Sequence, residues 1–138
     1  MKKRIVFFVI LITAAFALVG CADNDDTMVI SERFFANEML DLVINHQQYL
    51  DRTVQFEGMF RHLEPVDGQE RYMVMRYFMD CCEVLPLGLR VFLDDMEPFG
   101  EDAWVEVVGT LVLEEGTLAL RLTSIFEMEE QGAWIVMS

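Results

Sequence analysis

The sequence has little positive charge and almost no lysine. Lysine is absent after residue 3, and the 138 residues contain 10 Lys+Arg against 24 Asp+Glu, a formal net charge of −14. Residues 1–20 hold three of the basic residues and none of the acidic ones, so the remainder carries seven arginines, 24 acids and a charge of −17. A field of this sign repels phosphate backbones, which argues against nucleic acid as a partner.

Catalytic patterns are lacking as well. The sequence contains no Ser/His/Asp order, HExxH motif or glycine-rich phosphate loop, and His46 and His62 are its only histidines. No pair of carboxylates has a separation that can be read from the sequence, so acid/base catalysis has no basis here. We therefore expect a protein that is not an enzyme.

The longest apolar run lies at the N-terminus. A cationic head at residues 2–4 precedes an apolar stretch at 5–19, which is shorter than the ~20 residues of a membrane-crossing helix and predicts the helix of a signal peptide over residues 1–20. The run ends in LVGC (18–21), which resembles the lipobox of bacterial lipoproteins. The resemblance implies lipidation of Cys21, with membrane lipid as a partner and a location on the extracytoplasmic face of the cell membrane. An ordinary secretory signal with an incidental cysteine is the alternative.

The rest of the chain divides into a short tether and one domain. Residues 21–30 form an acidic tether, and residues 31–138 suit a single domain with one core. Apolar residues recur at helical spacing from Phe35 to Leu50, and Ser31 is placed to cap them, which predicts an amphipathic helix. His46 lies on the apolar stripe, where a packing role is commoner than a ligand role.

After residue 51 the hydrophobic period changes to two, which is typical of strands. Five strands are expected at 54–60, 71–79, 89–95, 104–113 and 118–129, with Asp67-Gly68 as a hairpin turn. Gly58 and Gly109 interrupt two of these strands, as bends or bulges do where a small barrel closes. The pattern predicts a mainly β fold, a five-stranded OB-like barrel preceded by the helix.

Two adjacent cysteines, Cys81 and Cys82, stand out in "MRYFMDCCEVLPLGLRV" (75–91). Neighbouring side chains on a regular strand point to opposite faces, so a joint role for both thiols needs a turn. Pro86 and Gly88 indicate that the chain is turning soon after the pair. Asp80 and Glu83 are poor strand formers, which predicts that the turn begins at the cysteines themselves, so that both sulfurs can face one side.

This stretch, with "YLDRTVQFEGMF" (49–60) and "DAWVEVVGTL" (102–111), resembles the C-terminal domain of the YcgQ-like two-component permease subunits. The resemblance implies an extracytoplasmic OB-like domain that works with a membrane permease and has no established activity. Those relatives carry transmembrane helices where this chain has a lipobox. Their aspartate shortly after the cysteines has no clear counterpart here, Glu83 being the nearest acid.

Three roles for the cysteine pair remain open. Cys81 and Cys82, with Asp80 and Glu83 nearby, could bind a divalent metal such as zinc, although they supply only half of a tetrahedral shell. In an oxidising compartment the two could instead form a strained, easily reduced vicinal disulfide. Alternatively, both are buried packing or turn residues.

We therefore expect a lipid-anchored, extracytoplasmic ligand- or metal-binding accessory domain that serves a membrane permease or envelope complex. Its ligand would bind at the barrel face or around Cys81–Cys82. The alternatives are a protein–protein interaction module with structural cysteines and a thiol-redox accessory that uses the same pair.

Overall fold

An amphipathic helix precedes the barrel, as predicted. The computed structural model describes residues 26–137, so the expected signal helix and Cys21 lie outside the described residues. The first elements are β1 (Met28–Val29), the 3-10 turn η2 (Glu32–Phe34), helix α2 (Phe35–Ile44) and the 3-10 turn η3 (His46–Gln48). The buried helix residues recur three or four positions apart and are Phe35, Ala36, Met39 and Leu42.

The helix is shorter than its sequence pattern predicts. It ends at Ile44, so His46 and Leu50 lie beyond it. Ser31 precedes η2 and its side chain makes no capping hydrogen bond. The Nδ1 atom of His46 lies 3.1 Å from the carbonyl oxygen of Val43, which ties the ring to the end of the helix.

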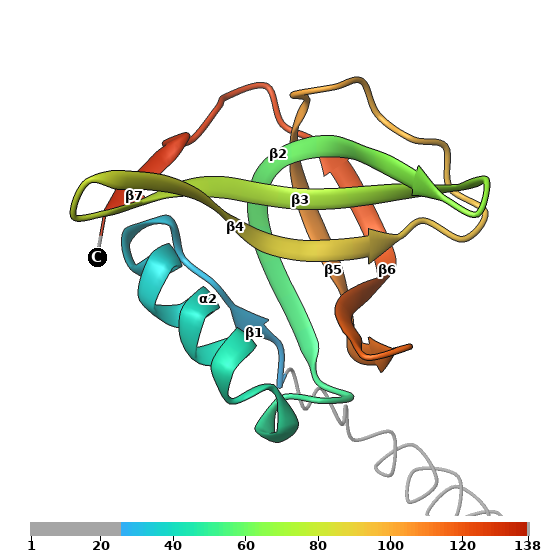
Figure 1. The fold of residues 1–138 in the computed structure, drawn as a ribbon, viewed down its shortest axis with the longest axis horizontal. Helices are drawn as coiled ribbons and strands as arrows, with labels where there is room; N and C mark the ends of the chain where they lie inside the picture. The colour runs from blue at the N-terminus through green and yellow to red at the C-terminus, as the bar shows by residue number, and fades with distance from the viewer. Residues whose placement is uncertain (1–25, 138) are drawn as a thin grey trace, which may run out of the picture.

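Five long strands close into a barrel. They are β2 (Thr53–Val66), β3 (Gln69–Asp80), β4 (Glu83–Phe92), β5 (Trp104–Glu114) and β6 (Thr117–Glu127). The order of pairing is β2–β5–β6–β4–β3–β2, antiparallel throughout except for the parallel β4–β6 pair. This Greek-key arrangement of five strands is the OB-fold, so the predicted fold class is confirmed (Figure 1).

One predicted turn is wrong. Pro86 and Gly88 lie inside β4 and not in a turn after the cysteines. β4 pairs with β6 only at Arg90–Phe92, so Pro86 lies where β4 is a sheet edge and its missing N–H costs no hydrogen bond. A Cβ at Gly88 would overlap the carbonyl oxygen of Val74, because β3 and β4 approach closely there.

The two strand glycines mark the close approaches that closure requires. β2 pairs with β5 up to Met59 and with β3 from Met59 onward, so the strand bends at this point. A Cβ at the preceding Gly58 would lie 2.8 Å from the carbonyl oxygen of Met75. Gly109 lies at the register shift between β5 and β6, which confirms the predicted bulge.

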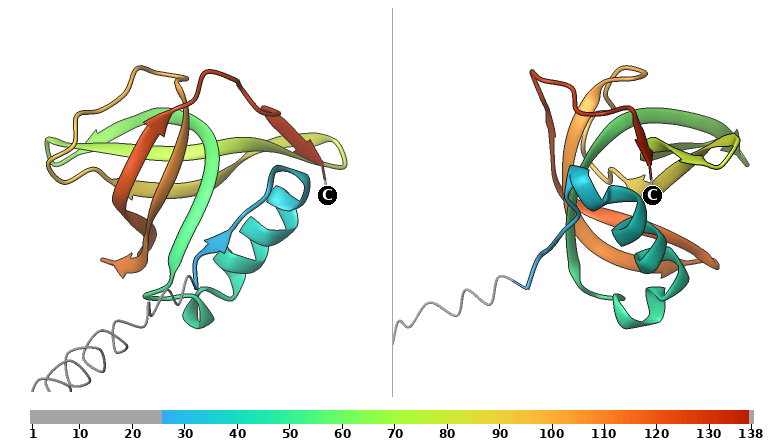
Figure 2. Two further views of the ribbon diagram at one scale, coloured as in Figure 1. Left: turned by 180° about the vertical axis from the view of Figure 1, so that it is seen from behind. Right: turned by 90° about the vertical axis from the view of Figure 1, so that its left-hand side faces the viewer.

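The core fills the barrel and the space beneath α2, which packs against the barrel (Figure 2). Burial of apolar surface there is the main driving force for folding. Fully buried side chains come from the helix and from all five barrel strands; the largest apolar ones are Trp104, Phe35, Phe56, Phe60, Met39 and Leu42.

Both ends of the described chain join the barrel. β1 pairs with β2 in parallel and Ile30 is buried, so residues 28–30 belong to the folded domain and not to the predicted tether. The short strand β7 (Ile135–Met137) pairs in parallel with β3 at Tyr77–Met79. Within residues 26–137, no helix has the length and apolar character to cross a membrane.

A buried arginine connects these ends. Arg76 on β3 is 1% exposed. Its Nε donates a hydrogen bond to the carbonyl oxygen of Glu57 at 2.9 Å, and its Nη1 donates to that of Ala133 at 3.3 Å. Nη1 also lies 3.2 Å from a carboxylate oxygen of Glu32. One guanidinium thus contacts the segment before α2, strand β2 and the segment before β7.

Two aromatic rings complete this environment. The Arg76 guanidinium carbon lies 5.0 Å from the ring centroid of Phe35 and 4.8 Å from that of Trp104. Burial lowers the pKa of Arg76 from its usual value, and the hydrogen bond to Glu32 opposes that shift. The planar, weakly hydrated guanidinium suits such a site better than lysine would.

Candidate functional site

Cys81 and Cys82 form the turn between β3 and β4. Asp80 ends β3, Glu83 begins β4, and the two are paired across the hairpin, which leaves a two-residue loop. Cys81 has φ +51°, whereas Cys82 is not among the residues with positive φ. That is the φ pattern of a type II′ turn, whose first central position normally belongs to glycine. The chain therefore reverses at the cysteine pair.

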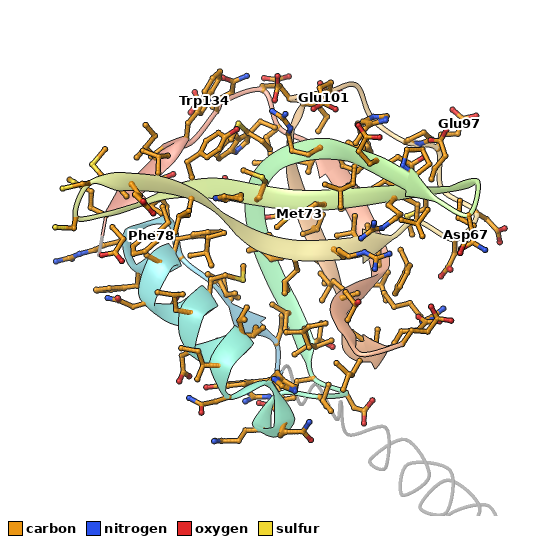
Figure 3. The ribbon with its side chains drawn as sticks, in the orientation of Figure 1. Asp67, Met73, Phe78, Glu97, Glu101 and Trp134 are labelled. Atoms are coloured by element: carbon orange, nitrogen blue, oxygen red, sulfur yellow. The ribbon has the colours of Figure 1, made fainter. Side chains whose placement is uncertain are left out.

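Both thiols are exposed and close together. The Sγ atoms lie 3.9 Å apart, well beyond the ~2.05 Å of a disulfide bond. The third interpretation, buried packing or turn residues, is wrong in its burial only, because both cysteines lie in the turn and both are exposed. Sulfur atoms gather at this end of the hairpin, as the yellow sticks in Figure 3 show.

The sulfur separation suits two thiolates bound to one metal ion. With Zn–S bonds of about 2.3 Å and an S–Zn–S angle near 109–120°, two ligand sulfurs lie about 3.8–4.0 Å apart. Residues 26–137 contain no group of three or more His, Cys, Asp or Glu side chains that could hold a metal. Asp80 and Glu83 therefore do not complete a shell in this conformation, and the pair supplies two ligands.

Exposed apolar side chains surround the thiols. Met79 is 38% exposed on β3, Val84 is 49% exposed and Leu85 is 46% exposed on β4. Ile135 and Met137 of the adjacent β7 are exposed at 48% and 75%. An apolar rim at a hairpin end is typical of a surface that contacts a partner.

A second concave site lies at the opposite end of β3. A cleft of about 420 Å³ is bounded by the β2–β3 turn, the end of β4 and the β5–β6 turn. Arg71 and Arg90 project into its lining together with Phe92, and Asp67 and Glu115 come from the two turns. The sequence patterns did not single out this cleft, because its residues come from three separate stretches of the chain, 66–71, 90–92 and 115.

A smaller cavity of about 150 Å³ lies beside Arg76. Two of its acidic lining residues, Glu32 and Glu57, already contact the Arg76 guanidinium, and the third, Glu106, accepts a hydrogen bond from Gln55 at 3.0 Å. The indole Nε1 of Trp104 donates to Glu57 at 3.3 Å. We assign this cavity a structural role. The sequence feature that indicates a buried arginine here is the position of Arg76 inside the apolar run "MVMRYFM". Arg76 is two residues from both Val74 and Phe78, so the three share one face of the strand.

The family model described as the DUF1980 C-terminal domain matches residues 15–130. A search of curated proteins found no match. The dimeric N-terminal domain of the PriB protein from Thermoanaerobacter tencongensis is 14% identical with a TM-score of 0.35, over 56% of this chain and 97% of that one. The second OB-fold domain of replication protein A from Methanococcus maripaludis is 16% identical with a TM-score of 0.29, over 60% and 88%. Neither structure carries information about a ligand for this chain.

Proposed function

The chain belongs to the DUF1980 C-terminal domain family, and from this premise we propose that it is a metal-binding accessory domain that captures a divalent ion such as zinc at Cys81 and Cys82. In this proposal a lipid on Cys21 holds the domain at the extracytoplasmic face of the cell membrane, where it serves a permease or envelope complex. The observation that carries the proposal is the 3.9 Å separation of two exposed sulfurs.

The incomplete shell supports a role in transfer and not in storage. A structural zinc site normally has four protein ligands, whereas the described residues offer two thiolates. The remaining positions would be filled by water or by side chains of the partner, so the ion stays open to exchange. The apolar rim around Met79 and Met137 provides the surface on which a partner would dock.

The acidic charge supports the same role. A formal charge of −14 raises the local concentration of cations and keeps polyanions away. Bound zinc would stabilise both thiolates and would supply Lewis acidity, while Cys81 and Cys82 fix its position at the hairpin turn. The chain's own contribution is to hold the two thiolates side by side, because β3 and β4 pair with each other right up to the turn, at Asp80 and Glu83.

Thiol chemistry without metal is the second candidate. Exposed neighbouring thiols can close into a vicinal disulfide, which adjacent cysteines form only with strain and which is therefore easily reduced. A third alternative is a protein–protein module in which the rim around the turn is the whole interface.

Metal analysis separates these functions. Protein purified without chelator is titrated with Zn²⁺ and the bound metal is measured by mass spectrometry, in the wild type and in the C81S and C82S variants. We expect bound zinc in the wild type and its loss in both variants, while the D80N/E83Q variant keeps it. Zinc that persists in a C81S/C82S variant, or no zinc in any form, would refute the proposal.

Alkylation tests the redox alternative. Two alkylated thiols in protein handled without reductant exclude a resting disulfide, whereas alkylation only after reduction supports it. Membrane fractionation of the wild type and of a C21A variant tests the anchor, which predicts release of the variant from the membrane.

A further inference from the structure

The cleft between the β2–β3 turn and the β5–β6 turn has the features of a second binding site. β3 spans 12 residues, so its two ends lie about 36 Å apart at ~3.3 Å per residue. The cleft is therefore separate from the cysteine turn. Its volume of about 420 Å³ lies in the range of small-molecule sites. Asp67 lies at the end of the β2–β3 hairpin, which forms one wall (Figure 3).

Two arginines in the cleft have no acidic partner among the described residues. Four of the seven arginines in residues 26–137 form ion pairs with carboxylates, but Arg71 and Arg90 form none. Residues 26–137 contain 22 carboxylates and seven arginines, so two guanidinium groups without a carboxylate partner in one cleft are informative. Each guanidinium group offers two parallel N–H donors, the arrangement that binds a carboxylate through two hydrogen bonds.

The fold holds one of these arginines in place. The Arg90 guanidinium carbon lies 5.7 Å from the ring centroid of Phe92, and that of Arg121 lies 5.6 Å from the same ring. Arg121 is itself fixed by Asp94 and Glu114. Stacking on Phe92 therefore orients the Arg90 side chain while leaving its N–H groups available to a ligand.

The rest of the lining sets the class of ligand. Six of the nine lining residues are polar or charged, which excludes a lipid tail. Asp67 and Glu115 on the walls, with Glu70 and Gln69 nearby, are acceptors for hydroxyl groups and repel a chain of phosphates. OB-folds bind oligonucleotides or oligosaccharides on this kind of surface, between the loops after the first and fourth barrel strands. The acidic walls favour the saccharide.

We propose that this cleft binds a saccharide that carries a single carboxylate. Its carboxylate would pair with Arg71 and Arg90, and its hydroxyls would donate to the wall residues Asp67, Gln69 and Glu115. The site is independent of the metal site proposed at Cys81 and Cys82.

Amide chemical shifts of the ¹⁵N-labelled protein test the proposal. The probes are glucuronate, glucose, alanyl-alanine and a ten-nucleotide oligo(dT). We expect glucuronate to shift amides of Arg71, Arg90 and their neighbours, and glucose to bind about tenfold or more weakly, because it lacks the charge-assisted hydrogen bonds to arginine. Equal binding of glucose, stronger binding of the dipeptide or the oligonucleotide, or no shifts at these positions with glucuronate would each overturn the proposal.

Matched variants locate the contact. The R71Q/R90Q variant is expected to weaken glucuronate binding about tenfold or more. The R33Q variant also removes an arginine for which no ion pair is found among the described residues. Arg33 is exposed and lies over the Phe34 ring in η2, away from the cleft lining, so its loss should leave binding unchanged. Zinc binding at the cysteine turn should be the same in both variants, so failure of one site does not decide the other. Unchanged glucuronate binding in R71Q/R90Q would refute the assignment.

Discussion

Replacement of Arg76 by methionine should destabilise the protein strongly. The variant keeps much of the side-chain volume but leaves the carbonyl oxygens of Glu57 and Ala133 without the hydrogen bonds of 2.9 and 3.3 Å. Hydrogen bonds to a charged group contribute about 1.5–3 kcal/mol each, so their loss costs about 3–6 kcal/mol. Removal of the desolvated charge returns part of this, because burial alone disfavours the guanidinium. We expect a net loss of about 3 kcal/mol in the free energy of unfolding.

Urea denaturation followed by circular dichroism measures this loss. With an m-value of about 1.5 kcal/mol/M, the unfolding midpoint should fall by about 2 M. R76K should fall by less, because lysine keeps the charge but cannot reach both carbonyls with a planar fork. R33M is the control and should stay within about 0.5 kcal/mol of the wild type, since Arg33 is exposed. A midpoint for R76M equal to or above that of the wild type would refute the reasoning.

Three further substitutions test local features. C81G should raise the free energy of unfolding by up to about 1 kcal/mol, since glycine relieves the positive φ of +51°, while C82G should not; thermal unfolding compares the two. The hydrogen bond to Asp41 raises the pKa of Tyr49 above 10.0, so its stabilisation is complete below that pH and is lost as pH rises through the folded pKa. The difference in urea midpoint between wild type and Y49F should therefore shrink above pH 10, and a constant difference would contradict the assignment. G109A should destabilise by about 1–3 kcal/mol, because its Cβ would overlap backbone at the β5–β6 bulge; a midpoint within error of the wild type would show that the bulge can relax.

Most of the fold could be predicted from the hydrophobic pattern of the strands and from the turn residues between them. Alternation and apolar runs between turn residues located all five barrel strands, and Asp67-Gly68 marked the β2–β3 turn, where both residues have positive φ. The errors occurred where pairing overrode local preference. Pro86 and Gly88 suggest a turn, yet β4 runs through both because it is an edge there and approaches β3 closely. Local composition carries no information about which part of a strand lacks a neighbour.

The candidate sites were predictable to different degrees. The cysteine pair was visible as a motif, and the poor strand formers beside it indicated the reversal that the structure contains. The exposure of both sulfurs and the absence of a third ligand group within residues 26–137 were not visible, because they depend on the neighbours of the turn in space. The arginine cleft gave no signal, since no spacing relates Arg71 to Glu115.

The sequence by itself determined the class of fold, the acidic field and the place where the chain could present two thiols, because periodicity, charge count and turn residues are local properties. Tertiary structure alone decided that the Sγ atoms of Cys81 and Cys82 are exposed to solvent and lie 3.9 Å apart. It also decided that Arg76 contacts Glu32, Glu57 and Ala133, which are far apart in the sequence. Closure of the barrel brings these distant residues within hydrogen-bonding range, and the register of its strands, not any short motif, selects which of them meet.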